Sequence, residues 1–150
     1  MEEQVTVNMP ALGDKAPSFK AVTTTGEINF PDDYRGKWVV LFSHPADFTP
    51  VCTSEIATFA AMRDDFHSLN TELIGLSIDS NNSHLAWIKE IQDNIRFGKY
   101  NGQPVDFPII ADIKAEVARK YGMVHPSMSD TKACLLYTSP SPRDRSVSRM

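Results

Sequence analysis

Three short apolar runs, each followed by a helix-like stretch, constrain the fold of this chain more than any other feature. The runs are WVVLFS at 38–43, ELIGLSID at 72–79 and FPIIA at 107–111. Continuous apolar runs of this length are typical of strands that are buried on both faces of a sheet. Ahead of them, residues 22–30 predict two short strands joined by a turn at Thr25-Gly26. Strands that alternate with helices in this way predict an α/β fold whose connected strands are largely parallel.

The stretches between the runs have the apolar spacing of amphipathic helices. A first helix is predicted from 53 to about 69, where apolar residues recur at intervals of three and four. A second is predicted from 84 to about 92, with Ser80 among the candidates for its N-cap. A third is predicted from position 112 or 114 to 121, and Gly122 is expected to end it in a left-handed conformation.

Length and charge narrow the class of protein. The 150 residues, 41% of them hydrophobic, fit one ordinary domain, and no stretch approaches the roughly 20 apolar residues of a membrane span. The acidic start MEEQVTVNMP lacks an apolar signal region, so a cytoplasmic location and reduced cysteines are expected. A formal charge of −4, with no basic cluster before the last residues, argues against a nucleic-acid partner.

The segment HPADFTPVCTSE follows the first apolar run and contains Cys52, the one cysteine of the first 133 residues. Cys52 lies at the start of a predicted helix, where unpaired backbone N–H groups and the helix dipole stabilise a thiolate. Thr49 and Thr53 add hydroxyls that can donate to the sulfur or to a bound oxygen, and Pro45 and a second proline stiffen the loop. This pattern predicts a rigid, partly dry pocket around one sulfur.

The position of Cys52 alone also allows a purely structural role, because a lone cysteine is often a small buried hydrophobic residue. Several named sites are excluded: Cys52 is not part of a C-x-x-C pair, the residue six positions later is Thr58 rather than the arginine of a phosphatase loop, and Cys134 is not at a zinc-ligand spacing. The four histidines are scattered and predict surface or hydrogen-bonded side chains rather than ligands. Only His44, eight residues before the thiol, is expected near it.

Pro45, Thr49 and Cys52 form the pattern PxxxTxxC within FSHPADFTPVCTSE. This pattern resembles the active-site signature of the peroxiredoxins (the alkyl hydroperoxide reductase and thiol-specific antioxidant family), in particular the subgroup with the one-cysteine enzymes. The segments GDKAPSF, ELIGLSIDS, HLAWIKEI and FPIIAD fall where that subgroup has them, so the resemblance covers roughly residues 10 to 133. It implies a thioredoxin-like α/β fold with a central mixed sheet flanked by helices.

The resemblance also implies a thiol-dependent peroxidase that reduces hydrogen peroxide and organic hydroperoxides. Cys52 would attack the peroxide and become a sulfenic acid. Thr49 would hydrogen-bond the peroxide, Pro45 would shield the sulfur from water, and His44 would support the pocket. No metal or other cofactor is implied. The implied partners are a thiol reductant such as thioredoxin or glutathione and further copies of the chain, as a dimer or a ring of dimers.

The end of the chain departs from the family's pattern. Relatives continue after the segment matching 127–133 into a strand with an active-site arginine, whereas here CLLYTSPSPRDRSVSRM follows. We expect a domain at 1–133, truncated before its last strand and helix, and a non-native or disordered tail at 134–150 that resembles a translated sequencing adapter. Cys134 is then no resolving cysteine and Arg143 no catalytic arginine. Without that arginine, the alternative function is a catalytically impaired redox-sensing or binding protein of the thioredoxin fold.

Overall fold

The computed structural model describes residues 9–124, and its sheet has five strands in the order β2-β1-β5-β4-β3. The strands are β1 (Phe19–Thr23), β2 (Gly26–Phe30), β3 (Trp38–Ser43), β4 (Thr71–Ser77) and β5 (Ile109–Ala111). Strands β3, β4 and β5 run parallel, and β1 is antiparallel to both β2 and β5. The predicted α/β fold with a mixed central sheet is confirmed. The expected domain end at 133 and the tail at 134–150 lie outside the described residues.

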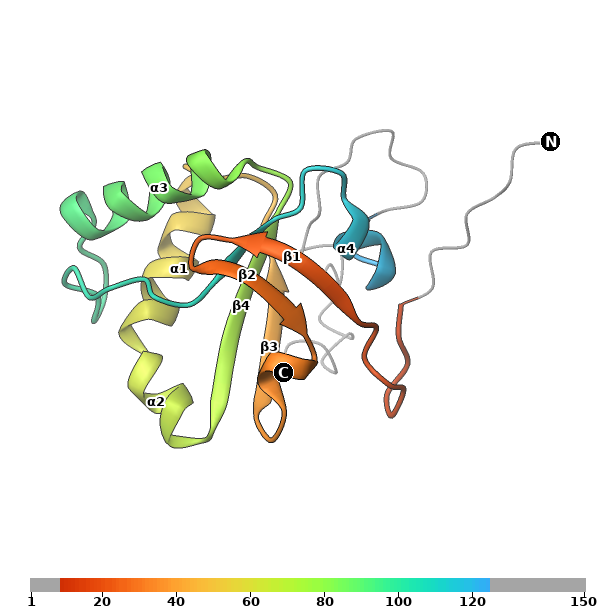
Figure 1. The fold of residues 1–150 in the computed structure, drawn as a ribbon. Coiled ribbons are helices and arrows are strands. Elements are labelled where there is room, and N and C mark those ends of the chain that lie inside the picture. The colour runs from red at the N-terminus through yellow and green to blue at the C-terminus, as the bar shows by residue number, and fades with distance from the viewer. Residues whose placement is uncertain (1–8, 125–150) are drawn as a thin grey trace, which may run out of the picture.

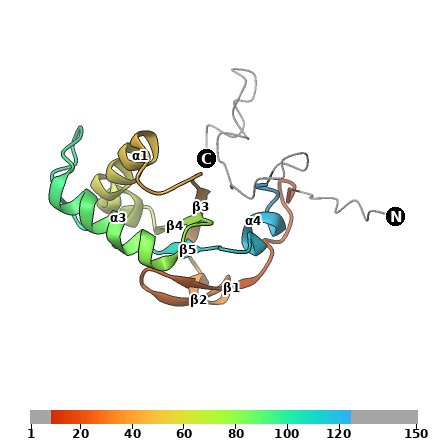
Figure 2. The same ribbon diagram turned by 90° about the horizontal axis from the view of Figure 1, so that it is seen from above.

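Helices lie on both faces of this sheet. They are α1 (Pro50–Ala61), α2 (Arg63–Ser68), α3 (Asn81–Asn94) and α4 (Glu116–Lys120), with a 3₁₀ turn η1 at Asp32–Tyr34. Figures 1 and 2 show α1, α2 and α3 together on one side of the sheet, with α4 on the other side beside β1. Within residues 9–124, no helix has the length and apolar character needed to cross a membrane.

Alternating residues of β4 divide the core into two parts, because successive side chains of a strand point to opposite faces. Leu73 packs on the α1 and α3 side with Trp87, whereas Ile74 and Leu76 pack on the α4 side with Val117. All five side chains are at most 4% exposed. The sheet is therefore covered on both faces in its centre, as the apolar run at 72–79 predicted.

One predicted strand is less buried than expected. Only Phe42 and Ser43 of β3 are buried, and Trp38 is 76% exposed. The prediction that 38–43 is covered on both faces is wrong for the first residues of the run. The reason is topological, since β3 pairs only with β4 and forms one edge of the sheet among residues 9–124.

The helix predicted at 53–69 is two helices. It begins three residues earlier, with Pro50 in the first helical position that suits its fixed φ, and it breaks at Met62. The backbone N–H of Met62 bonds the carbonyls of Thr58 and Phe59 and ends α1. Apolar spacing could not reveal this break, because Phe59, Met62 and Phe66 keep the helical interval across it.

The starts of α3 and α4 are set by side chains that cap them. Ser80 is the N-cap of α3, and its hydroxyl accepts the N–H of Ser83 at 3.1 Å, so the helix begins at 81 rather than 84. The Asp112 carboxylate accepts the N–H groups of Val117 and Ala118, which delays the start of α4. Gly122 has a φ of +64° just after α4, as predicted.

Candidate functional site

Cys52 is the third residue of α1, at the carboxyl edge of the parallel strands. The chain leaves β3 at Ser43, crosses a six-residue loop at 44–49 and enters α1 with Thr49 as the N-cap. Carboxyl edges of parallel strands are the usual location of sites in α/β folds. The Cys52 side chain is 3% exposed, and its position in the first turn places it beside unpaired helix N–H groups, which stabilise an anion.

A pocket of about 240 Å³ opens beside this cysteine. It is lined by Ser43, Pro45, Thr49, Pro50, Val51, Cys52 and Glu55. The structure therefore brings Cys52, Thr49 and Pro45 together around one cavity. Sequence reasoning missed Ser43, because it ends an apolar run and looks like part of the strand. Its buried hydroxyl has no hydrogen-bond partner within the described part of the chain.

The two threonine hydroxyls differ in their roles. Thr49 lines the pocket, and its hydroxyl donates to the Ala46 carbonyl at 3.0 Å. Thr53 does not line the pocket, so the expectation that it serves the sulfur is corrected. Its hydroxyl donates to the Thr49 carbonyl at 2.7 Å and accepts the Trp87 indole N–H at 3.1 Å. Thr53 thus links the first turn of α1 to α3.

His44 is not among the residues that line the pocket. Its ring is 2% exposed, and its Nε2 lies 2.7 Å from Oδ1 of Asp47. The other carboxylate oxygen of Asp47 lies 2.7 Å from Nδ1 of His84 and accepts the Ser83 hydroxyl at 2.8 Å. We call His44, Asp47 and His84 the buried triad. The spacing of His44 and Asp47 was a possible signal in the sequence, whereas nothing there indicated His84.

Asp47 is ionised within this cluster. Burial would raise the pKa of its carboxyl, but hydrogen bonds from His44, His84 and Ser83 and the charge of His84 outweigh it and hold the pKa well below its usual range. The backbone N–H of Asp47 also donates to the Asp79 carboxylate at 2.8 Å. The loop at 44–49 is therefore held by hydrogen bonds to the segment that connects β4 to α3 and to the start of α3.

The triad consists of metal-ligand residue types, and its ligand atoms lie within 4.8 Å of one another. Two zinc ligands at about 2.0–2.1 Å in tetrahedral geometry would stand roughly 3.3–3.5 Å apart. Both nitrogen-to-oxygen distances are 2.7 Å, which is a hydrogen-bond length. The arrangement fits a hydrogen-bonded cluster better than a metal centre.

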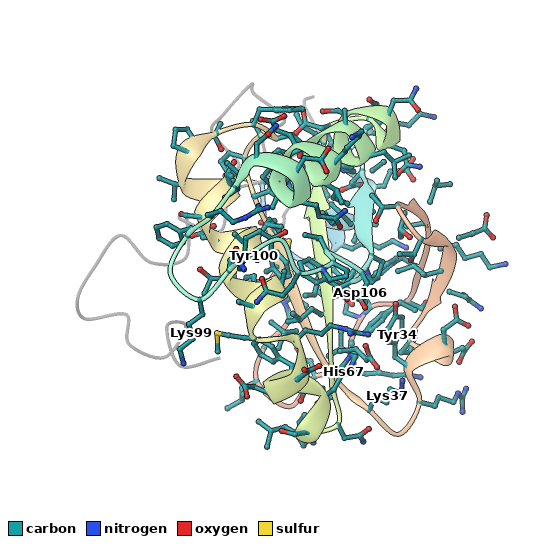
Figure 3. All side chains as sticks on the ribbon, turned by 90° about the vertical axis from the view of Figure 1, so that its left-hand side faces the viewer. Tyr34, Lys37, His67, Lys99, Tyr100 and Asp106 are labelled. Carbon is teal, nitrogen blue, oxygen red and sulfur yellow. The ribbon has the colours of Figure 1, made fainter. Side chains whose placement is uncertain are left out.

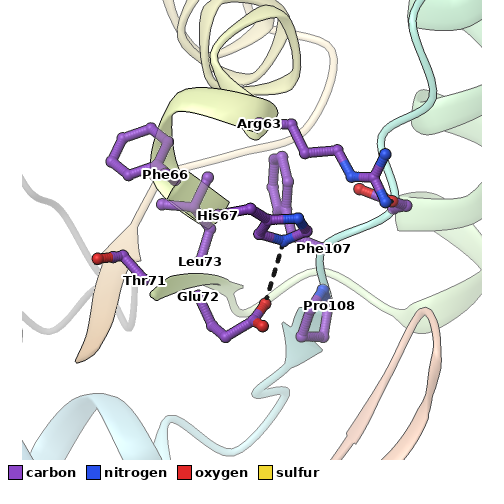
Figure 4. Close-up of a pocket in the computed structure, with 9 residues that line it drawn as sticks. Arg63, Phe66, His67, Thr71, Glu72, Leu73, Phe107 and Pro108 are labelled. Carbon is purple, nitrogen blue, oxygen red and sulfur yellow. Dashed lines mark ion pairs between the residues drawn. The ribbon is translucent and has the colours of Figure 1, made fainter. Parts of the chain in front are cut away.

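A second, smaller pocket of about 110 Å³ lies at the opposite, amino edge of the strands (Figure 4). Its charged side chains are already paired: Arg63 with Asp106 at 2.6 Å and His67 with Glu72 at 3.5 Å. Lys37, labelled with His67 in Figure 3, also pairs with Glu72, at 2.8 Å. Burial would raise the pKa of Glu72, but these partners outweigh it and lower the pKa. Among the described residues that line this pocket there is no thiol and no charged side chain without a partner of opposite charge.

Residues 12–140 match the family model described as the AhpC/TSA family. A peroxiredoxin of Methanosarcina mazei is 62% identical over 125 residues, which are 83% of this chain and 57% of that protein. A peroxiredoxin of Aquifex aeolicus is 54% identical over 125 residues, which are 83% of this chain and 54% of the relative. The chain thus spans little more than half the length of these relatives.

Comparison with solved structures also finds similarity to peroxiredoxins. A yeast mitochondrial 1-Cys peroxiredoxin matches with a TM-score of 0.70 and 41% identity, over 83% of this chain and 58% of the yeast chain. A cysteine-to-serine mutant of peroxiredoxin 6 from Arenicola marina matches with a TM-score of 0.67 and 36% identity, over 80% of this chain and 53% of the other. The thioredoxin-like fold expected from the sequence is confirmed.

Proposed function

This chain belongs to the AhpC/TSA family, and from that premise we propose that the protein is a thiol-dependent peroxidase with Cys52 as its nucleophile. The observation that supports this most directly is the position of Cys52. It lies in the first turn of α1 and shares a pocket with Thr49 and Pro45, as the peroxiredoxin signature requires. The substrates are hydrogen peroxide and organic hydroperoxides.

The oxidation of Cys52 needs no atom beyond its thiol and the peroxide, whereas its reduction needs two further thiols. The Cys52 thiolate attacks one peroxide oxygen, so that a sulfur–oxygen bond forms while the oxygen–oxygen bond breaks. The departing oxygen takes up a proton, which balances the one that the Cys52 thiol released on ionisation, and leaves as water or an alcohol, and the sulfur becomes a sulfenic acid. Two thiols then return the sulfenic acid to a thiol, with loss of water and formation of a disulfide.

The residues around Cys52 have separate roles in this proposal. Negative charge moves from sulfur to the departing oxygen, so fixed donors at the pocket lower the barrier. Helix N–H groups at Cys52 stabilise the starting thiolate, and Thr49, whose hydroxyl now donates to Ala46, turns it toward the bound peroxide. Pro45 shields the sulfenic acid from water at the wall of the pocket. His44 does not line the pocket and supports the loop through its bond to Asp47.

We assign the completion of the cycle to a separate thiol; within residues 9–124, Cys52 is the one cysteine and is unpaired. The yeast mitochondrial relative has its thiol resolved through the glutathione and thioredoxin systems, and we assign a reductant of this kind here. Such chemistry suits the reducing cytoplasm. The protein acts as a homo-oligomer in this proposal. High identity to named peroxiredoxins favours an active peroxidase over the impaired sensing or binding protein.

The test compares two single-cysteine variants. We expect Cys52→Ser to lower peroxide consumption by several orders of magnitude, because the nucleophile is removed. Cys134→Ser, which removes the chain's other cysteine, is the matched control and should keep the rate. Peroxide loss in the presence of a thiol reductant and trapping of the sulfenic acid by dimedone are the two measurements. Equal rates for Cys52→Ser and the unaltered protein would refute the proposal.

A further inference from the structure

His84 has an acceptor at each of its two ring nitrogens. Nδ1 lies 2.7 Å from a carboxylate oxygen of Asp47, and Nε2 lies 3.1 Å from the carbonyl oxygen of Ile110. The side chain is 0% exposed, so water cannot replace either partner. A neutral imidazole has only one N–H group and would direct its lone pair at one of these oxygens. Only the imidazolium, with hydrogen on both nitrogens, satisfies both contacts.

The charges of the cluster support this protonation state. The buried Asp47 carboxylate needs a compensating cation, because an unpaired charge in the interior is strongly destabilising. His44 needs only a single N–H to reach Asp47, and its Nδ1 has no hydrogen-bond partner within residues 9–124. Asp79, another carboxylate at this edge, accepts from the Asp47 N–H and the Ser77 hydroxyl. The positive charge therefore belongs to His84.

The triad fixes the loop that forms one wall of the Cys52 pocket. Asp47 lies between Pro45 and Thr49, and the Thr49 hydroxyl donates to Ala46, the residue just before Asp47. His44 packs against Trp87 with ring centroids 4.9 Å apart. The Asp47 carboxylate links His44 on this loop to Ser83 and His84 on α3.

We propose that His84 is a positioning residue of the peroxidase site. As a buried imidazolium it fixes the Asp47 carboxylate, and through Asp47 it orients the loop that presents Pro45 and Thr49 to Cys52. His84 does not touch the peroxide. This inference rests on the proposed peroxidase function for its effect on rate, whereas the charge of His84 can be measured independently of any activity.

The first measurement is the ¹⁵N NMR spectrum of the histidine rings in the full-length protein. We expect both ring nitrogens of His84 to carry hydrogen at about pH 7, because each of them faces an oxygen acceptor. Its ionisable neighbours in the structure are Asp47, bonded to its Nδ1, and His44, with ring centroids 6.0 Å apart. A ring nitrogen without hydrogen on His84 at this pH would overturn the proposal, whatever the peroxidase assay gives.

The second measurement compares two amide variants that each keep one of the two hydrogen bonds. His84→Asn places its amide nitrogen near the position of Nδ1 and can still donate to Asp47. His84→Gln places its amide nitrogen near Nε2 and keeps the bond to Ile110. We expect the rate of Cys52 oxidation by peroxide to fall at least tenfold more in His84→Gln than in His84→Asn. Equal losses would mean that His84 only fills space, and would refute a positioning role.

These outcomes separate the two proposals. If Cys52→Ser leaves peroxide consumption unchanged while His84 is doubly protonated, the peroxidase proposal fails and the assigned charge stands. If Cys52 is the nucleophile but His84 is neutral or the two amide variants react equally fast, only the positioning role fails.

Discussion

The two edges of the parallel strands contain the same kinds of charged side chains in different surroundings. At the carboxyl edge, His84 and Asp47 are paired at side-chain exposures of 0% and 2%. At the amino edge, Arg63 and Asp106 are paired at 42% and 39%, and His67 and Glu72 at 45% and 28%. Exposed pairs contribute about 0–1 kcal/mol, whereas breaking a buried pair costs about 3–5 kcal/mol. Burial, rather than the residue types, marks the edge that holds the proposed site.

The largest expected effect on stability is at the buried triad. We expect Asp47→Asn, which keeps the size of the side chain, to lower the free energy of unfolding by about 3–5 kcal/mol, because it leaves the His84 cation unpaired. Urea denaturation followed by circular dichroism at about pH 7 measures this change. A loss below about 1 kcal/mol would place the triad in the same energetic class as the exposed pairs.

The next effect is on the rate of reaction at the carboxyl edge. We expect Thr49→Val to slow oxidation of Cys52 by about 10²–10³-fold, because it removes a donor that lines the pocket. Thr53→Val is the matched control, since its hydroxyl points to the Thr49 carbonyl and to Trp87 rather than into the pocket. Stopped-flow measurement of the reaction with hydrogen peroxide gives both rates. Similar losses in the two variants would remove the special role of Thr49.

The local features of the molecule were predictable from sequence, and its long-range pairings were not. Apolar runs gave the parallel strands, and the Ser80 cap and Gly122 were found because each acts on its own helix end. The placement of Cys52 at a helix start followed from the same local logic. His84 and Asp47, by contrast, are 37 residues apart, and only the packing of α3 against the 44–49 loop brings them together.

The edge position of β3 in the described sheet and the helix break at Met62 were missed for a related reason. Hydrophobic periodicity reports which face of an element is apolar, but it does not report what covers that face. Trp38 looks like a core residue in the sequence, yet it starts a strand with a single neighbour in the described sheet. Met62 keeps the helical spacing of its neighbours although the backbone there is no longer helical.

Acid should reduce the difference between the two edges in what their ion pairs contribute to the free energy of unfolding. The pKa of Asp47 is lowered below its ordinary value of 3.8 in the folded protein, so the unfolded chain binds the proton first. Its stabilising contribution is complete above about pH 5 and is lost as the pH falls below about 4. The gap in unfolding free energy between the unaltered protein and Asp47→Asn should therefore narrow from about pH 5 downward. A gap that stays constant to about pH 3 would mean that Asp47 is not the anion of the triad.

The smallest expected effect is at the amino edge. Glu72→Gln removes the pairings of that carboxylate with Lys37 and His67, both of which are 45% exposed. Water and salt screen such pairs, so we expect a loss of at most about 1 kcal/mol that shrinks further as ionic strength rises. Glu72 lies at the far end of β4 from Cys52, so the rate of peroxide reduction should be unchanged. Denaturation at low and high salt, together with the stopped-flow assay, tests both statements. A loss comparable to that of Asp47→Asn would show that exposure does not separate the two edges and would return the amino-edge pocket to consideration as a site.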